Sequence, residues 1–91
     1  MTKTKVFRGT EVFTLVEYTA QETEVEFGYN FAEEVPGAVK ELAIEESDGT
    51  LIAYEMEDGT CQLHISGRGR GGYGTVTKNE AIDALIEDAK W

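Results

Sequence analysis

The sequence predicts an α+β fold in which an antiparallel β-sheet of about five strands, a hairpin plus a three-stranded meander, packs against one C-terminal helix. Three observations support this fold class. Residues 11–31 are rich in β-branched and aromatic side chains, two Asp-Gly pairs divide residues 41–66 into short segments, and a capping signature precedes an apolar helical stripe near the end. Because 91 residues suffice for one hydrophobic core, we expect a single domain over residues 1–91.

The hairpin is predicted from residues 11–18 and 23–31, joined by the polar turn Thr19–Glu22. Apolar side chains alternate with glutamate, glycine and asparagine in the second strand, which is typical of a half-buried strand. The residues expected to face the core are Val25, Phe27, Tyr29 and Phe31. The resulting register places Phe13 and Leu15 on the opposite, acidic face, where they would either be covered or make apolar contacts with a partner or a second copy.

The meander is predicted from residues 41–47, 50–57 and 60–66, with Asp48-Gly49 and Asp58-Gly59 as its turns. A two-residue turn at the second site gives one apolar face, built from the pairs Met56 with Cys61, Tyr54 with Leu63 and Ile52 with Ile65. A bulged three-residue turn at the first site extends that face through the pairs Ile44 with Ile52 and Leu42 with Tyr54. Residues 38–46 also fit helical spacing, so a short helix is the alternative to a strand there.

The clearest predicted element is a helix over about residues 78–90. Thr77 can accept a hydrogen bond from the backbone of Glu80 while the Glu80 side chain reaches back to Thr77, which is the capping-box arrangement. The apolar stripe that follows consists of Ile82, Leu85, Ile86 and Ala89. We expect this stripe to lie on the sheet and close the core.

The net charge of −10 is unevenly distributed along the chain. Residues 9–67 contain fourteen acidic side chains and a single basic one, Lys40, which gives a local balance of −13. Residues 1–8 carry +3, and residues 68–91 sum to zero. Such an acidic block disfavours nucleic acid and anionic membranes as ligands and favours a basic partner.

The cellular location is inferred from two further features. The N-terminal residues lack the apolar run of a secretory signal, and no stretch has the roughly 18 apolar residues of a membrane span. A single cysteine, Cys61, cannot form an internal disulfide, in keeping with a reducing compartment. We therefore expect a cytoplasmic protein without a membrane segment.

The sequence offers few groups for catalysis. His64 is the only histidine and Cys61 the only thiol, and three positions apart on one strand they point to opposite faces. Cys61 is interpreted as a small buried hydrophobe and His64 as a surface residue. The Asp-Gly turns lack the alternating oxygen ligands of a calcium loop. We expect no enzyme activity, no metal and no cofactor, with paired carboxylates as the one open route to catalysis.

The segment 67–74, Gly-Arg-Gly-Arg-Gly-Gly-Tyr-Gly, is the one unusual local motif. Its glycines allow backbone N–H groups to face a ligand, Arg68 and Arg70 suit phosphate or carboxylate, and Tyr73 offers a stacking face. It contains no GxxxxGK[ST] pattern and no GxGxxG spacing at a strand-to-helix junction. Its two interpretations are an anion- or nucleic-acid-binding loop and a connection whose arginines keep it solvated or pair with the chain's own carboxylates.

The function favoured by the sequence is that of a non-enzymatic inhibitor or regulator that presents an acidic β-sheet surface to a basic, nucleic-acid-handling protein. The glutamates assigned to this surface are Glu11, Glu17, Glu24, Glu26, Glu45, Glu46, Glu55 and Glu57. Carboxylates spaced along strands can imitate the phosphates of nucleic acid and so occlude the partner's binding site. The alternative interpretation is that the charge serves solubility alone.

In size and charge the chain resembles, as a class, small acidic phage-encoded inhibitors of host defence, including anti-CRISPR proteins and DNA mimics. That resemblance implies a viral protein that binds a protein partner and acts without catalysis. No motif carries it, so it is a likeness of class and not of family. A homodimer formed through Phe13 and Leu15 or an exposed edge strand is a second expectation.

Overall fold

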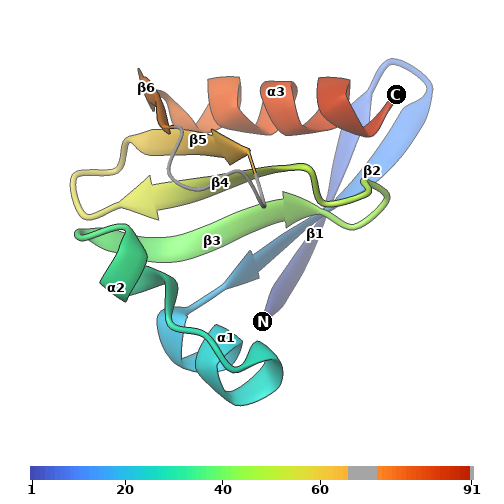
Figure 1. Cartoon of the computed structure of the whole chain (residues 1–91). Helices are drawn as coiled ribbons and strands as arrows, with labels where there is room; N and C mark the ends of the chain where they lie inside the picture. Colours follow the sequence, from blue (N-terminus) through green and yellow to red (C-terminus); the bar gives the residue numbers. More distant parts are fainter. Residues whose placement is uncertain (66–71, 91) are drawn as a thin grey trace.

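Six strands and three helices follow one another in the computed structural model, which describes residues 1–65 and 72–90 (Figure 1). In chain order they are β1 (Thr2–Arg8), β2 (Glu11–Tyr18), α1 (Ala20–Phe27), α2 (Phe31–Glu34), β3 (Ala38–Ile44), β4 (Leu51–Met56), β5 (Cys61–Ile65), β6 (Gly72–Val76) and α3 (Lys78–Ala89). The strands form one antiparallel sheet in the order β1-β2-β3-β4-β5-β6. The predicted α+β fold with a C-terminal helix is confirmed, with six strands where about five are expected.

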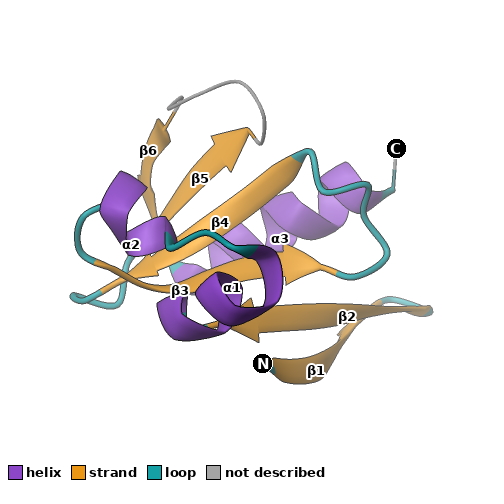
Figure 2. Cartoon of the chain, turned by 60° about the horizontal axis from the view of Figure 1, so that its bottom comes forward, coloured by secondary structure: helices purple, strands orange, loops and turns teal. Residues whose placement is uncertain are grey.

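The sheet is covered by helices on both faces, with α3 behind it and α1 and α2 in front in Figure 2. α3 packs on β3, β4 and β5, whereas α1 and α2 contact β3 from the other side. The core under α3 includes Phe13, Leu15, Leu42, Ile44, Ala53, Cys61, Ala81, Ile82, Leu85 and Ile86. The core under α1 and α2 includes Phe31, Val35, Ala38 and Tyr54. The sequence predicts helical cover on one face only, so the second layer is the main departure from expectation.

The predicted second strand of the hairpin is wrong, because residues 20–27 form the helix α1. Thr19 begins the helix with a capping box: its hydroxyl accepts the Glu22 N–H at 3.3 Å, and the Glu22 carboxylate accepts the Thr19 N–H at 2.9 Å. Gly28 ends it in the left-handed conformation, with φ of 79°, which glycine adopts without steric cost. The apolar alternation in this segment therefore belongs to an exposed helix and the turn after it.

β2 pairs with two strands other than the predicted one. On one side lies β1, with pairs running from Thr2 opposite Glu17 to Arg8 opposite Glu11. On the other side lies β3, which places Leu15 opposite Ile44. The strand interpretation of residues 38–46 is confirmed by β3, and the helical alternative is excluded for this segment.

The predicted order of the meander and the positions of its two turns are confirmed, but the turn lengths and the register are wrong. At Asp58-Gly59 the Gly59 N–H donates to the Met56 carbonyl at 3.0 Å, and Met56 N–H donates to the Thr60 carbonyl at 2.8 Å. With Gly59 left-handed at φ of 88°, this is a three-residue bulged turn in place of the two-residue turn that the sequence suggests. The connection between β3 and β4 is longer still, spanning residues 45–50.

These turns shift the pairing by one residue on both sides of β4. Tyr54 lies opposite Gln62 instead of Leu63, and Leu42 lies opposite Ala53 instead of Tyr54. Because side chains alternate along a strand, a slip of one residue exchanges the two faces. Ala53 therefore packs under α3, and Tyr54 packs on the side of α1 and α2.

The C-terminal helix is confirmed in its extent, cap and buried face. The Thr77 hydroxyl accepts the Glu80 N–H at 3.1 Å, and the Glu80 carboxylate accepts the Thr77 N–H at 3.0 Å. Ile82, Leu85 and Ile86 are all buried against the sheet. Within residues 1–65 and 72–90, no helix combines the length and the apolar composition that crossing a membrane demands.

Candidate protein-binding surface

The eight glutamates assigned to an acidic sheet face do not gather on one face. Glu24 and Glu26 lie on α1, Glu45 and Glu46 follow β3, and Glu57 follows β4. Glu11 begins β2 at the β1–β2 turn. Glu17 and Glu55, on β2 and β4, point towards α3, where both meet Lys78. The glutamates of the expected continuous acidic sheet surface are thus divided among two loops, one hairpin end, one helix and the two partly buried ion pairs with Lys78.

Two of these glutamates stabilise the contact of α3 with the sheet. Lys78 Nζ lies 3.0 Å from Glu17 Oε1 and 3.2 Å from Glu55 Oε1. Burial on its own would lower the pKa of Lys78, but the bonds to the two carboxylates outweigh it, and the pKa is raised. Glu17 and Glu55 are therefore committed to a contact inside the chain.

Three more of the glutamates are engaged at the surface. Thr14 donates to Glu46 through its backbone N–H at 2.8 Å and its hydroxyl at 3.0 Å, and the backbone bond is the main reason that the pKa of Glu46 is lowered. Glu45 pairs with Lys3, and Glu11 lies 3.5 Å from Lys90. Exposed pairs of this kind contribute little stability because solvent screens them, but they reduce the charge shown to a partner.

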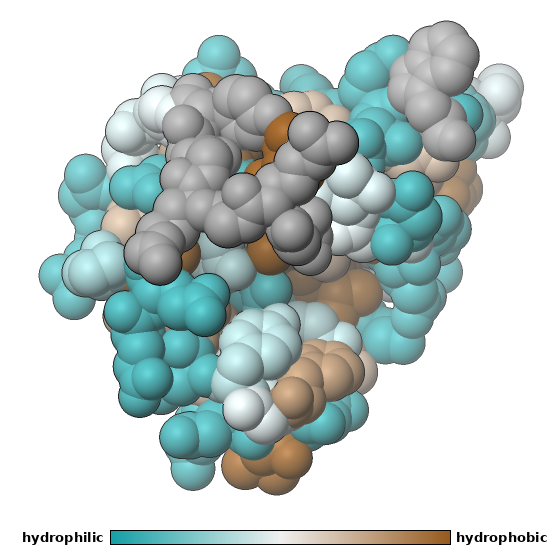
Figure 3. Space-filling model, viewed as in Figure 1, coloured by the Kyte–Doolittle hydropathy of each residue, from teal (hydrophilic) through white to brown (hydrophobic). Residues whose placement is uncertain are grey.

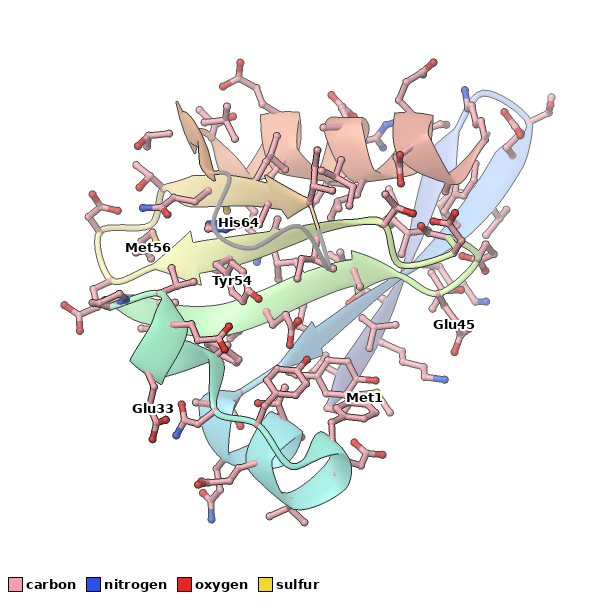
Figure 4. All side chains as sticks on the ribbon, in the orientation of Figure 1. Met1, Glu33, Glu45, Tyr54, Met56 and His64 are labelled. Carbon is pink, nitrogen blue, oxygen red and sulfur yellow. The ribbon has the colours of Figure 1, made fainter. Side chains whose placement is uncertain are left out.

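Four of the exposed acidic residues without an ion-pair partner lie on α1 and α2, while Asp48, Glu57, Asp58 and Glu87 lie elsewhere. In the described ranges, Glu24, Glu26, Glu33 and Glu34 are exposed and have no ion-pair partner. Glu22 pairs with the N-terminal ammonium group, which brings Met1 to α1 (Figure 4). Residues 19–37 include five glutamates and no lysine or arginine. This helical layer is therefore strongly acidic.

The same layer exposes large apolar side chains, which we call the α1 patch: Val25, Phe27 and Tyr29. Their exposed fractions are 82%, 53% and 39%. Figure 3 shows small tan and brown areas at the lower end of the molecule, with hydrophilic surface between and around them. An open hollow of about 310 Å³ beside the α1 patch is lined by Gln21, Glu22, Val25 and Glu26. An apolar centre with a charged rim is the usual composition of a protein-binding surface.

Sequence reasoning assigned the α1 patch to the core and so missed it. The available signal was the Thr19-x-x-Glu22 spacing, which is identical to the Thr77-x-x-Glu80 spacing that correctly predicts α3. Gly28, placed just after the last helical residue, is a second signal of a helix end. Together they predict a helix over these residues in place of a strand.

Beneath the patch lies a buried carboxylate. Glu41 of β3 is only 6% exposed, and its Oε2 and Oε1 atoms accept the Tyr29 hydroxyl at 2.6 Å and 3.0 Å. Burial raises the pKa of Glu41 despite this hydrogen bond, and Glu34 adds to the rise. Burial likewise raises the pKa of Tyr29 and of Tyr54. In the described part of the chain, this is the only side-chain hydrogen-bond contact between residues 20–34, which include α1, α2 and the turn between them, and the strands.

We expect Glu41→Gln to stabilise the protein at neutral and higher pH. The pKa of Glu41 is raised in the folded protein, so folding disfavours the ionised carboxylate. The free energy of unfolding of the wild type is therefore greatest below the ordinary glutamate pKa, and it falls as the pH rises through the pKa of the folded state. Glutamine removes the charge and keeps an oxygen that can accept the Tyr29 hydroxyl. The variant and wild type should unfold at similar urea concentrations at about pH 4, and the variant at a higher concentration at about pH 8.

Glu57→Gln is the matched control, because Glu57 is exposed and its substitution removes the same charge. Its stability difference from wild type should stay small at both pH values. A Glu41→Gln variant that is less stable than wild type at the higher pH would show that the ionised carboxylate is a favourable partner of Tyr29.

The remaining candidate residues have other places. Phe13 and Leu15 are buried under α3, because the strand register directs both to that face, so they are covered within the chain. Arg68 and Arg70 lie outside the described residues, and of the Gly/Arg segment only the backbone at Tyr73 and the residues beside it is placed, in β6. The proposed anion loop therefore stays a prediction.

Cys61 and His64 lie on opposite faces of β5, as predicted. Cys61 is fully buried under α3, and this burial raises the pKa of its thiol. His64 packs edge-on against Tyr54, with ring centroids 5.0 Å apart, and Figure 4 shows the two side by side on β4 and β5. Across residues 1–65 and 72–90, there is no group of three or more histidine, cysteine or acidic side chains able to hold a metal ion.

Comparison with known proteins gives no functional information about this chain. No protein-family model matches the chain, and neither a curated protein nor a solved structure shows significant similarity to it. The functional argument therefore rests on the α1 patch and its surroundings.

Proposed function

We propose that this chain is a non-enzymatic binding protein that docks on a basic partner through α1 and α2. The observation that carries the proposal is the combination of exposed Val25, Phe27 and Tyr29, on α1 and in the turn after it, with exposed, unpaired glutamates on α1 and α2. Solvent-exposed aromatic side chains of this size are costly to leave on a monomer's surface and are enriched where proteins bind one another.

The charge of this layer favours a basic partner of the nucleic-acid-handling kind. Five glutamates without a lysine or arginine across residues 19–37 attract a positively charged surface and repel nucleic acid itself. A protein that binds nucleic acid presents such a surface. Docking there would occlude it, so the chain would act as an inhibitor or regulator, with its carboxylates in the place of phosphates.

Reversing Glu24 and Glu26 to lysine is expected to abolish capture of the partner. Both side chains are exposed on α1, and lysine in the second half of a helix suits its dipole, so the fold should persist. The measurement is a pull-down with tagged protein at low and high salt, with mass spectrometry of the bound proteins and a parallel assay for nucleic acid. Capture should weaken as salt rises, because the attraction is partly between exposed charges.

The matched control reverses Glu57 and Glu87, which are also exposed but lie outside α1 and α2. It changes the net charge by the same amount and should retain capture. Equal loss in both double variants would mean that total charge alone drives the binding. Captured nucleic acid that disappears in an Arg68→Ala, Arg70→Ala variant would instead assign binding to the Gly/Arg segment.

A further inference from the structure

Three aromatic rings form a continuous platform at the C-terminal end of α1. Phe27 and Tyr29 flank the left-handed Gly28, and this turn stacks their rings with centroids 6.1 Å apart and an angle of 21°. Tyr18 of β2 meets the edge of Phe27 at 5.4 Å and 77°. More than half of Phe27 and more than a third of Tyr29 are exposed, so part of the platform faces solvent.

The surroundings of this platform are mainly negative, and the two cations nearest to it, Lys3 and the N-terminal ammonium group, are already paired with Glu45 and Glu22. Glu41 lies under Tyr29, and Glu34 and Tyr54 are its further titratable neighbours. Lys40, next in sequence, pairs across the sheet with Glu55 and so points to the α3 face. Among the residues placed in the structure, no lysine, arginine or terminal amine pairs with Glu41, and the last turn of α1 holds no basic side chain. The carbonyl groups that end α1 add a partial negative charge.

An aromatic face within such a field attracts a cation. The shape of the platform decides which cation. Phe27 and Tyr29 stack nearly parallel and Tyr18 meets Phe27 edge-on, so the rings offer a flat face more than a cage, and a compact ammonium group gains few contacts there. A planar guanidinium can stack on an exposed ring face while its N–H groups point to carboxylates at the edge.

We infer that the platform of Tyr18, Phe27 and Tyr29 is an arginine-binding site, on which a guanidinium group of the basic partner stacks. This inference rests on the proposed function and specifies the chemistry that the α1 patch recognises. It predicts that an arginine peptide binds more tightly than a lysine peptide of equal charge. Attraction by the acidic surface alone would not distinguish the two peptides.

The test compares two homopeptides of equal length, one of arginine and one of lysine, titrated into isotopically labelled protein and followed by NMR. The arginine peptide should bind about two- to fivefold more tightly than the lysine peptide, the value of an exposed cation–π contact. The largest ring-proton shifts should fall on Phe27 and Tyr29. Phe27→Ala should reduce the arginine preference to about one.

Phe7→Ala is the matched control, because Phe7 is 67% exposed on β1, away from the platform. It should retain the preference for arginine. Equal affinity for the two peptides, absence of binding by the wild type, or a preference unchanged by Phe27→Ala would overturn the arginine site. The proposed docking surface is tested separately by the pull-down. If the two peptides bind equally but the Glu24 and Glu26 reversal abolishes partner capture, the arginine site is wrong and the docking surface is still supported.

Discussion

Replacing Phe31 with alanine is expected to lower the free energy of unfolding by about 3–5 kcal/mol. Phe31 opens α2 and is fully buried, with its ring centroid 5.4 Å from that of Tyr54 on β4. Truncation removes the apolar contacts and leaves a cavity that a four-residue helix can fill only in part. Urea unfolding followed by circular dichroism measures the change.

Val25→Ala is the informative control for that experiment. A strand over residues 23–31 would bury Val25 and Phe31 on the same face, whereas the structure leaves Val25 82% exposed on α1. The control should alter stability by no more than about 0.5 kcal/mol. Losses of similar size in the two variants would argue for the strand. If Phe31→Ala proves too unstable to study, Phe31→Leu should show a smaller loss of the same sign.

Replacing Leu85 with alanine is expected to cost about 2–5 kcal/mol. Leu85 is 1% exposed at the centre of the α3 stripe and belongs to the same core as Ala53 and Cys61. Truncation removes apolar contacts in this core and leaves a cavity. Thermal or urea unfolding gives the measurement.

Glu87→Ala on the exposed side of α3 is the corresponding control and should change stability by no more than about 0.5 kcal/mol.

Under conditions in which the Leu85→Ala variant is still folded, this variant should capture the partner as the wild type does, because α3 and the α1 patch lie on opposite faces of the sheet. A selective loss of capture in folded Leu85→Ala protein would place the docking surface on the α3 side.

The two helical layers thus serve different purposes. α3 presents an apolar stripe to the sheet and stabilises it, with Lys78 adding contacts to Glu17 and Glu55. α1 instead buries Thr23 and leaves Val25 and Phe27 outside. A short helix whose largest apolar side chains are exposed to solvent contributes little to stability. Such exposure favours a role in binding.

The elements that the sequence determined by itself are those that local chemistry specifies. The Thr77 cap and the spacing of Ile82, Leu85 and Ile86 specify α3, since a capping box and a 3.6-residue period need no distant partner. The order of β3, β4 and β5 follows from the Asp-Gly turns, and the burial of Cys61 follows from its alternation with Leu63.

What only the tertiary structure decided depends on contacts between distant segments. The period-two pattern of Val25, Phe27 and Tyr29 fits a strand equally well, and it becomes a helix and a turn because β1 and β3 occupy both edges of β2. The register at β4 changes by one residue with little local cost, yet it moves Tyr54 to the face of α1 and α2. Ion pairs such as Lys78 with Glu17 engage some glutamates within the chain, so charge along the sequence could not show which acids stay unpaired.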